Sequence, residues 1–422
     1  MERKITKELI KWKNESANKP LFLYGTRQVG KTYSVLDFGK EYYKNVAYFD
    51  TSNNFELREI LEKETILERS ITQLSLLSGE SIFKSDTLIV FDNCDDANTI
   101  KSMKIFNNSA YNVIMIGSNR DMINKSHIGD FYYRQMMPLD FPEYLQNTDR
   151  NQLVDFIKDS YDNDVPMPFH QMAMDAYYEY LMCGGFPEVV IARMNGQSDL
   201  EIEAIKQKII NIYRSECVKY DSNNISFVRS NEVINSMPFQ LTKDNRKFQY
   251  GLIKKGGRSK DYEGNINTLV TNGILNRSYR LMDVKSPLSS VRDLESFKLY
   301  CNDVGLLYTM LHLNKTKFLT DDNVRRSLVE NNVANTLINN GYNLYYHQSD
   351  GKAEVSFVIQ NRLGKVIPIE LVNMKLTKAK ALSLFLSKYN LVDAIKITEN
   401  NFSRKKGIKY IPLYATFCLK DM

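Results

Sequence analysis

The sequence predicts an α/β fold in which a parallel sheet begins at a phosphate-binding loop. Residues 21–24 (LFLY) are apolar or aromatic, as in a buried parallel strand. The next eight residues, GTRQVGKT at 25–32, fill the pattern G-x-x-x-x-G-K-[ST] without a mismatch. A helix-like segment follows, and then a second strand-like run at 45–50 (NVAYFD). Strand, loop, helix and strand in this order are typical of a doubly wound sheet.

The loop residues are of the types that bind the phosphates of a nucleoside triphosphate. They are Gly25, Thr26, Arg27, Gln28, Val29, Gly30, Lys31 and Thr32. Glycines at both ends let the backbone wrap inward, so that successive N–H groups point at phosphate oxygens. In such loops the lysine reaches the β- and γ-phosphates and the threonine hydroxyl ligates Mg²⁺. The sequence therefore predicts ATP and Mg²⁺ as ligands, with Thr32 as one metal ligand.

Two further strand ends are candidates for the same site. Residues 87–92 (TLIVFD) form an apolar run that ends in Asp92, an arrangement in which the carboxylate holds Mg²⁺ through water. A third strand-like run at 111–116 is followed by Ser118 and Asn119. These two polar side chains are candidates for contact with the γ-phosphate or the attacking water. A polar turn that only ends a strand is the alternative.

Composition favours a soluble chain of several domains in a reducing compartment. At 422 residues the chain has the length of two to four domains. Its 56 basic and 50 acidic residues leave a net charge of +6, which compels no nucleic-acid partner. The five cysteines are scattered and form no C-x-x-C pair, as expected of free thiols. No uncharged apolar run approaches the roughly 20 residues that span a bilayer, so we expect a cytoplasmic protein without membrane attachment.

Several strings in a fixed order carry a resemblance to a known family. They are GTRQVGKT at 25–32, the strand that ends in Asp92, IGSNRDM at 116–122, MMPLDFPEYL at 136–145, YLMCGGFPEVV at 180–190 and FKLYCNDVGLL at 297–307. The chain resembles a widespread prokaryotic family of AAA-type ATPases that carry a C-terminal domain of unknown function. The resemblance covers nearly the whole chain. It implies an AAA-type nucleotide-binding domain at 1–150 and a helical lid at 151–222.

The chain departs from this family directly after Asp92. Where the family reads Asp-Glu-Ile-Gln, this chain reads Asp92, Asn93, Cys94 and Asp95. An asparagine can orient a water molecule but cannot accept its proton. The resemblance therefore implies weak or absent ATP hydrolysis, unless Asp95 or Asp96 substitutes as the base from a shifted position. The candidate catalytic residues are Asp92, Asn93 and Asp95, with Asp92 also a metal ligand.

Residues 223–290 are expected to form a winged-helix-like module behind a boundary in the Asn- and Ser-rich stretch 221–247. A helix at 262–271 and a strand-like run at 274–281 (ILNRSYRL) would be its helix and wing. Basic residues near them can neutralise phosphates of DNA or RNA, namely Lys254, Lys255, Arg258 and Lys260. A solvated basic face or a surface for another protein is the alternative.

Residues 291–422 resemble a restriction-endonuclease core: a helix at 325–339 followed by strand-like runs at 344–347, 354–360, 366–371, 394–397 and 411–413. The resemblance places a site at Glu330, Glu354, Ser356, Glu370 and Val372. Where the family reads E-V-D-F and I-E-V-K, this chain reads EVSF at 354–357 and IELV at 369–372. A serine is a poor ligand for a hard cation, and a valine cannot activate water. We expect a nuclease-like domain without nuclease activity.

Three functions remain open at this point. The first is an ATP-Mg²⁺-binding protein with weak or absent hydrolysis, whose nucleotide state is coupled to the C-terminal domain. The second is an adaptor that binds nucleic acid or a protein and holds ATP as a structural ligand, and the least favoured is an active nuclease. The sequence leaves monomer, dimer and ring open. It assigns no arginine finger, although Arg120 and Arg134 lie in the expected region.

Overall fold

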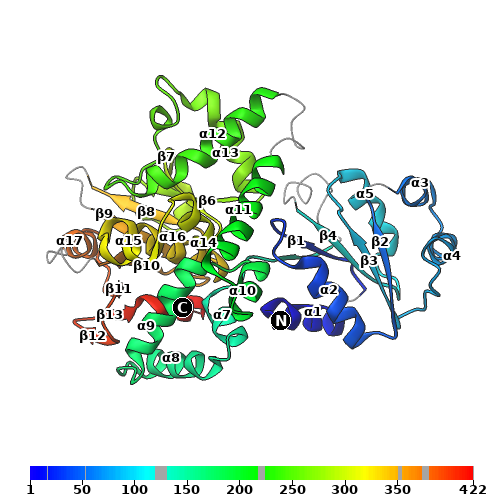
Figure 1. Ribbon diagram of the computed structural model, residues 1–422, viewed down its shortest axis with the longest axis horizontal. Coiled ribbons are helices and arrows are strands. Elements are labelled where there is room, and N and C mark those ends of the chain that lie inside the picture. Colours follow the sequence, from blue (N-terminus) through cyan, green and yellow to red (C-terminus); the bar gives the residue numbers. More distant parts are fainter. Residues whose placement is uncertain are drawn as a thin grey trace. The chain divides into compact units, whose positions relative to one another are not determined.

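The computed structural model describes residues 1–16, 18–52, 54–118, 131–216, 224–349, 354–372 and 380–421. The chain forms two compact units. Unit 1 consists of Met1–Met137 with Thr271–Gly273, and unit 2 consists of Pro138–Val270 with Ile274–Met422. Each unit contains one sheet with helices packed on it (Figure 1).

The sheet of unit 1 is parallel in every described pairing. Its strands lie in the order β2-β3-β4-β1-β5. They are β1 (Leu21–Tyr24), β2 (Asn45–Asp50), β3 (Thr87–Asp92), β4 (Asn112–Gly117) and β5 (Tyr132–Gln135). The predicted parallel sheet is confirmed, and β5 is an addition to it. Because the strands run in one direction, their carboxyl ends meet at a single edge of the sheet.

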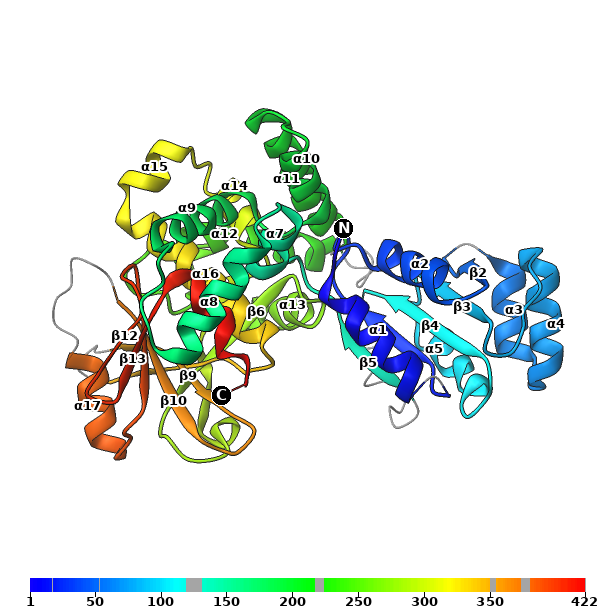
Figure 2. The same cartoon turned by 90° about the horizontal axis from the view of Figure 1, so that it is seen from below.

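Helices cover both faces of this sheet (Figure 2). They are α1 (Lys4–Glu15), α2 (Lys31–Tyr42), α3 (Phe55–Lys63), α4 (Leu67–Ser78) and α5 (Ala97–Ser102), with a 3-10 turn η1 (Met103–Phe106) after α5. One face of the sheet buries Phe22, Phe91 and Met115 in a core that α3, α4 and α5 complete. On the other face α2 brings Gly39 against the side chains of Val46 and Leu88. The sheet is therefore wound on both sides.

Unit 2 contains an eight-stranded mixed sheet in the order β12-β13-β11-β10-β9-β8-β6-β7. The strands are β6 (Leu275–Leu281), β7 (Arg292–Cys301), β8 (Tyr345–Gln348), β9 (Glu354–Gln360), β10 (Val366–Leu371), β11 (Ala394–Thr398), β12 (Ser403–Lys405) and β13 (Ile408–Pro412). One face of this sheet is apolar, where Val355 and Val358 pack with Leu382 and Phe385 of α17 (Lys380–Tyr389). Charged side chains described below lie between other strands and α16 (Asp322–Asn339).

The remaining helices of unit 2 precede or interrupt this sheet. They are α7 (Phe141–Asn147), α8 (Asn151–Asn163), α9 (His170–Cys183), α10 (Pro187–Met194), α11 (Asp199–Glu216), α12 (Asn224–Leu241), α13 (Ser259–Thr271), α14 (Val304–Met310) and α15 (Lys315–Thr320), with 3-10 turns η3 (Tyr250–Leu252), η4 (Leu288–Val291) and η5 (Leu413–Asp421). Among the described residues, no helix is long and apolar enough to cross a membrane.

The expected winged-helix-like module at 223–290 is not confirmed. Its helix is present as α13, but the strand expected as a wing, β6, pairs with β7 and β8 inside the large sheet. A boundary at 290 therefore falls within one sheet. The Asn- and Ser-rich stretch 221–247, in which a boundary was expected, contains the 18-residue helix α12. This helix buries Val233, Met237 and Leu241, so packing decided the conformation where periodicity was weak.

Candidate nucleotide-binding site

The phosphate loop lies where the sequence placed it, between β1 and α2. Gly30 precedes α2 with a φ of 91°, a left-handed conformation that favours glycine. At Gly25 the backbone passes so close to Met136 that an added Cβ would lie 2.1 Å from its carbonyl oxygen. Larger residues at either position would therefore force the loop to move.

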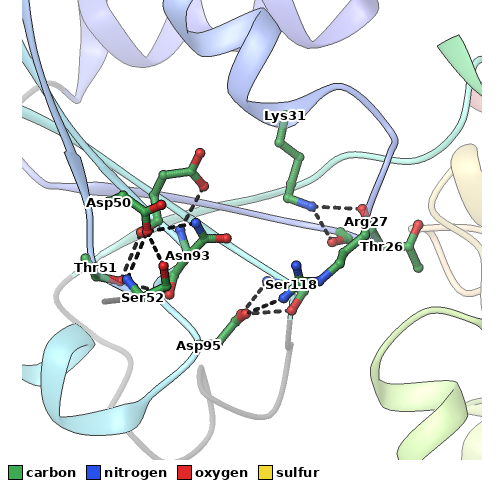
Figure 3. Close-up of polar contacts among 11 residues, drawn as sticks. Thr26, Arg27, Lys31, Asp50, Thr51, Ser52, Asn93, Asp95 and Ser118 are labelled. Carbon is green, nitrogen blue, oxygen red and sulfur yellow. Dashed lines mark hydrogen bonds and ion pairs between the residues drawn. The ribbon is translucent and has the colours of Figure 1, made fainter. Parts of the chain in front are cut away.

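The side chain of Lys31 points back toward the start of the phosphate loop (Figure 3). Its Nζ donates to the carbonyl oxygens of Gly25 at 2.7 Å and Thr26 at 2.8 Å. Burial lowers the pKa of Lys31 to about 8, although the charges of Asp95 and Asp92 act to raise it. The ammonium group is thus held by neutral carbonyls in a place where an anion would stabilise its charge.

Asp92 at the end of β3 collects three donors. Its Oδ2 accepts from the Thr32 hydroxyl at 2.6 Å and from the Tyr48 hydroxyl at 3.0 Å, and its Oδ1 accepts from the backbone N–H of Asn93 at 2.8 Å. The structure thus brings the two predicted metal ligands, Thr32 and Asp92, together. Tyr48 was missed by sequence reasoning. The signal for it is the strand run that ends at Asp50, because parallel pairing sets Asp50 beside Asp92 and Tyr48 beside Val90.

Asn93 is turned toward strand β2. Its Nδ2 donates to Asp50 Oδ1 at 2.9 Å, and its backbone has a φ of 59°. The backbone N–H and hydroxyl of Ser52 donate to the same Asp50 oxygen. Burial alone would raise the pKa of Asp50, but these hydrogen bonds outweigh it and lower that pKa. Asn93 is therefore a hydrogen-bonding partner of Asp50, with its amide already engaged.

Asp95 lies in a second cluster on the side of the phosphate loop (Figure 3). Its Oδ1 accepts from the backbone N–H of Ser118 at 2.7 Å and from the Ser118 hydroxyl at 2.8 Å. Its Oδ2 lies 3.7 Å from a guanidinium nitrogen of Arg27. The structure thus joins Arg27, Asp95 and Ser118. Asn119 and Arg120 lie outside the described residues, and Arg134 forms an ion pair with Glu8 at 2.7 Å.

The residues present fit a triphosphate with Mg²⁺. The buried ammonium of Lys31 donates to two neutral carbonyl oxygens, and the loop ends at the N-terminus of the 12-residue helix α2. Both features favour an anion. Thr32 and Asp92 offer a hydroxyl and a carboxylate, which are oxygen donors of the kind that Mg²⁺ prefers.

The three glutamates expected at a nuclease-like site in unit 2 form ion pairs with lysines. Lys298 on β7 lies 3.1 Å from Glu330 and 2.6 Å from Glu354. The side chains of Lys298 and Glu330 are both 0% exposed. Tyr300 donates to Glu330 at 2.9 Å, and Arg246 lies 3.4 Å from its other oxygen. Within the described ranges, no group of three or more His, Cys, Asp and Glu side chains is arranged to hold a metal ion.

The remaining members of that set lie on neighbouring strands. Glu370 on β10 is paired with Lys396 on β11 at 3.2 Å. The Ser356 hydroxyl accepts from the backbone N–H of Leu371 at 3.3 Å, and Val372 directly follows β10. Lys298 and Lys396 were missed as members of this cluster. Their signal is a single lysine in each of two mostly apolar strand runs, 297–301 (FKLYC) and 394–398 (AIKIT).

The basic residues expected to contact nucleic acid are exposed around the start of α13. They are Lys254, Lys255, Arg258 and Lys260. Lys254 and Lys255 line a hollow of about 540 Å³, but Glu232 and Asp261 line it as well. Asp261 also accepts from the backbone N–H of Arg258 and lies 3.5 Å from Arg229. This surface carries mixed charge.

The fold and site of unit 1 define a P-loop nucleotide-binding domain: a parallel sheet with a phosphate loop after its first strand and an acidic residue at the end of a neighbouring strand. Residues 17–145 match the AAA domain family, so this part of the chain is a P-loop domain of the AAA ATPase type. Residues 174–317 and 326–416 match two domains of unknown function, DUF8612 and DUF4143. Neither match confirms a winged helix or a nuclease core.

No curated protein matches the chain. Among solved structures, similarity is found to the Walker-type ATPase PABY2304 of Pyrococcus abyssi, with 11% identity, a TM-score of 0.40, and coverage of 73% of this chain and 95% of that one. A signal transduction ATPase with a tetratricopeptide repeat sensor from Pyrococcus horikoshii has 13% identity and a TM-score of 0.30, covering 78% and 44%. Drosophila ORC bound to DNA has 14% identity and a TM-score of 0.27, covering 70% and 90%.

Proposed function

We propose that the chain binds ATP with Mg²⁺ through its phosphate loop and hydrolyses it slowly, with Asp95 as the carboxylate that orients the attacking water. The observation that supports Asp95 is its position. Ser118 holds one of its oxygens through two hydrogen bonds, and the other oxygen lies beside Arg27 of the phosphate loop. Its charge acts on Lys31, which indicates that both groups share one site.

The residues of the chain have separate tasks in this proposal. The loop N–H groups and Lys31 bind phosphate oxygens, and burial strengthens the attraction between the ammonium and an anion. Thr32 and Asp92 hold Mg²⁺, which supplies charge neutralisation at the phosphates when bound. Ser118 fixes the rotamer of Asp95. Asp95 orients the attacking water molecule and accepts a proton from it.

Slow turnover follows from what stands at position 93. The side chain next to Asp92 is an amide, which cannot accept a proton, and its N–H group is bonded to Asp50. The carboxylate that remains is two residues further on, and as an aspartate it is one methylene shorter than the glutamate of the related family. Its Oδ2 also lies 3.7 Å from a guanidinium nitrogen of Arg27.

We further propose that the nucleotide state acts on unit 2. A change in the amide hydrogen exchange of unit 2 on addition of Mg²⁺-ATP would test this coupling.

The test compares ATP binding and phosphate release on the same preparations with Mg²⁺. We expect Lys31→Ala to weaken ATP binding at least about tenfold, because the buried cation is lost. We expect Asp95→Asn to leave ATP binding within about threefold of wild type and to lower turnover about 10²-fold or more, the usual contribution of a positioned base. Asn93→Gly is the matched control, because glycine accepts the positive φ at this position, and it should leave turnover nearly unchanged.

A fourth variant, Asn93→Glu, separates the two carboxylate positions. If Asn93→Glu hydrolyses ATP faster than wild type while Asp95→Asn hydrolyses as fast as wild type, the base position is 93 and the assignment to Asp95 is wrong. If no preparation binds ATP with Mg²⁺, the proposed function itself fails.

A further inference from the structure

A groove lies between helices α3 and α4 of unit 1, which pack side by side next to strand β2 (Figures 1 and 2). Its volume is about 750 Å³. We call it the α3–α4 groove, and its lining residues are Glu56, Glu59, Ile60, Lys63, Glu64, Gln73, Leu76 and Leu77. None of these residues belongs to the nucleotide site.

The groove has an apolar floor and apolar edges that are open to solvent. Leu76, which lines the groove, is 81% exposed. Ile60 and Leu77 are half-buried against the core of the unit. Apolar side chains gathered in this way on a soluble domain mark an interaction site.

The charged lining is acidic. It consists of Glu56, Glu59 and Glu64 with a single lysine, Lys63, whose ammonium is paired with Glu59 at 2.6 Å. Glu64 lies 3.5 Å from Arg69, so two of the three glutamates have a basic partner. In the part of the chain that the structure describes, Glu56 forms no ion pair. A ligand that complements this groove therefore brings positive charge for Glu56 together with apolar groups.

We propose that the α3–α4 groove binds an amphipathic helical segment of a protein partner, with Leu-like side chains on the floor and Lys or Arg side chains at the acidic edge. A groove between two helices accepts a third helix through anchors spaced by three or four residues. The acidic lining repels a phosphate backbone, which argues against nucleic acid. Charge complementarity thus selects a cationic helix.

The groove is connected to the nucleotide site through the start of α3. Asn54 caps α3 by accepting from Leu57 N–H at 2.9 Å. Arg58 donates to the carbonyl oxygens of Thr51 at 3.2 Å and Ser52 at 2.8 Å. The Thr51 hydroxyl in turn donates to the carbonyl oxygens of Asp92 and Asn93. A helix that displaces α3 would act on residues 51 and 52, and this part of the inference rests on the proposed function.

The binding test uses an 18-residue peptide of Leu and Lys at helical spacing, labelled with fluorescein, and the full-length protein without nucleotide. Fluorescence anisotropy should show saturable binding that weakens as salt is added. A peptide in which Glu replaces every Lys should bind at least about tenfold more weakly, because its charge matches that of the groove. Equal binding of the two peptides would overturn the proposal.

Two pairs of variants locate the binding surface. Leu76→Asp should weaken binding of the Lys peptide at least about tenfold, whereas Leu200→Asp, at a leucine that is 84% exposed in unit 2, should not change it. Glu56→Gln should weaken binding and reduce its salt dependence, whereas Glu62→Gln, on α3 but outside the groove, should not. Binding that survives Leu76→Asp contradicts the proposal. If the protein self-associates and Leu76→Asp abolishes that self-association, the groove binds a second copy of the chain, and the proposal of a separate partner is wrong.

The connection is tested separately from the groove. Saturating Lys peptide should change the ATP affinity of wild type, and Arg58→Ala should bind the peptide normally but lose this change. If the peptide binds and ATP affinity does not respond in wild type, the connection is wrong while the groove stands. Failure of ATP binding without peptide would count against the proposed function alone, because peptide binding is measured without nucleotide.

Discussion

Replacing Lys298 by methionine tests whether the buried charges of unit 2 form one interdependent cluster. Methionine keeps most of the volume of the lysine stem and removes the ammonium. The carboxylate of Glu330 is 0% exposed, and after the change Arg246, at 3.4 Å, is the one ion-pair partner that it retains among the described residues. Glu354, 19% exposed, loses its contact at 2.6 Å. Removing one partner of a buried ion pair costs about 3–5 kcal/mol, because the other charge stays buried and unpaired.

The titration of Glu330 gives a second measure of the same cluster. Burial alone would raise the pKa of Glu330, but the charges of Lys298 and Arg246 outweigh it and lower that pKa from 4.5 to about 2. The lowered pKa means that the folded state is stabilised while Glu330 is charged. Because the pKa in the folded state is depressed, this stabilisation is present above pH 4.5 and is lost as the pH falls toward 2. The difference in unfolding free energy between wild type and Lys298→Met should therefore shrink over that range.

The assay is urea unfolding followed by a probe of unit 2, with thermal unfolding in parallel. A loss of about 3–5 kcal/mol lowers the melting temperature by roughly 6–15 °C for a unit of this size. The matched control is Lys365→Met, because Lys365 also lies 2.6 Å from a carboxylate, Asp393, but the two side chains are 55% and 44% exposed. That exposed pair should contribute less than about 1 kcal/mol. If Lys298→Met and Lys365→Met cost the same, the argument from burial is refuted.

Three further predictions concern binding. The Lys31 pKa of about 8 predicts that ATP binding weakens by up to about tenfold per pH unit above pH 8, because only the charged form attracts phosphate. Isothermal titration calorimetry should show this pH dependence in wild type, and the dependence should vanish in Lys31→Arg. Tyr48→Phe removes a donor from Asp92 and should raise the Mg²⁺ concentration needed for ATP binding about threefold to tenfold without changing binding in EDTA. Charge reversal of Lys254 and Lys255 to Glu should abolish any salt-dependent DNA affinity, and an unchanged gel shift would exclude this surface.

The nucleotide site was predictable where chemistry follows a fixed spacing along the chain. The eight loop residues and Asp92 stand in the order that the phosphate loop requires, and the parallel sheet brings Thr32 within 2.6 Å of Asp92. The roles of Asn93 and Asp95 were not predictable to the same degree. They depend on side-chain direction after a strand: the left-handed backbone at Asn93 turns its amide toward Asp50. No periodicity in the sequence encodes such a turn.

The fold of unit 2 was predictable strand by strand and less so as a whole. The runs at 354–360 and 366–371 were assigned within the bounds that the structure gives. The pairing of β6 with β7 and β8 was not predicted, because a wing and an interior strand have the same apolar alternation. Helix α12 was missed since its buried residues are held by contacts distant in sequence, such as the bond from Ser327 to the carbonyl oxygen of Leu241. Local patterns cannot report contacts of that kind.

The two units of the chain treat buried carboxylates in opposite ways, and this difference indicates where a divalent cation can enter. Asp92 accepts hydrogen bonds from the hydroxyls of Thr32 and Tyr48, which carry no charge. A cation that arrives there therefore meets a carboxylate whose hydrogen-bond partners are neutral, and it need not displace a positively charged side chain. Glu330 instead faces a buried ammonium from Lys298, which a cation would have to displace into a protein interior that cannot solvate it. The same carboxylate chemistry therefore leaves unit 1 open to Mg²⁺ and closes the corresponding position in unit 2.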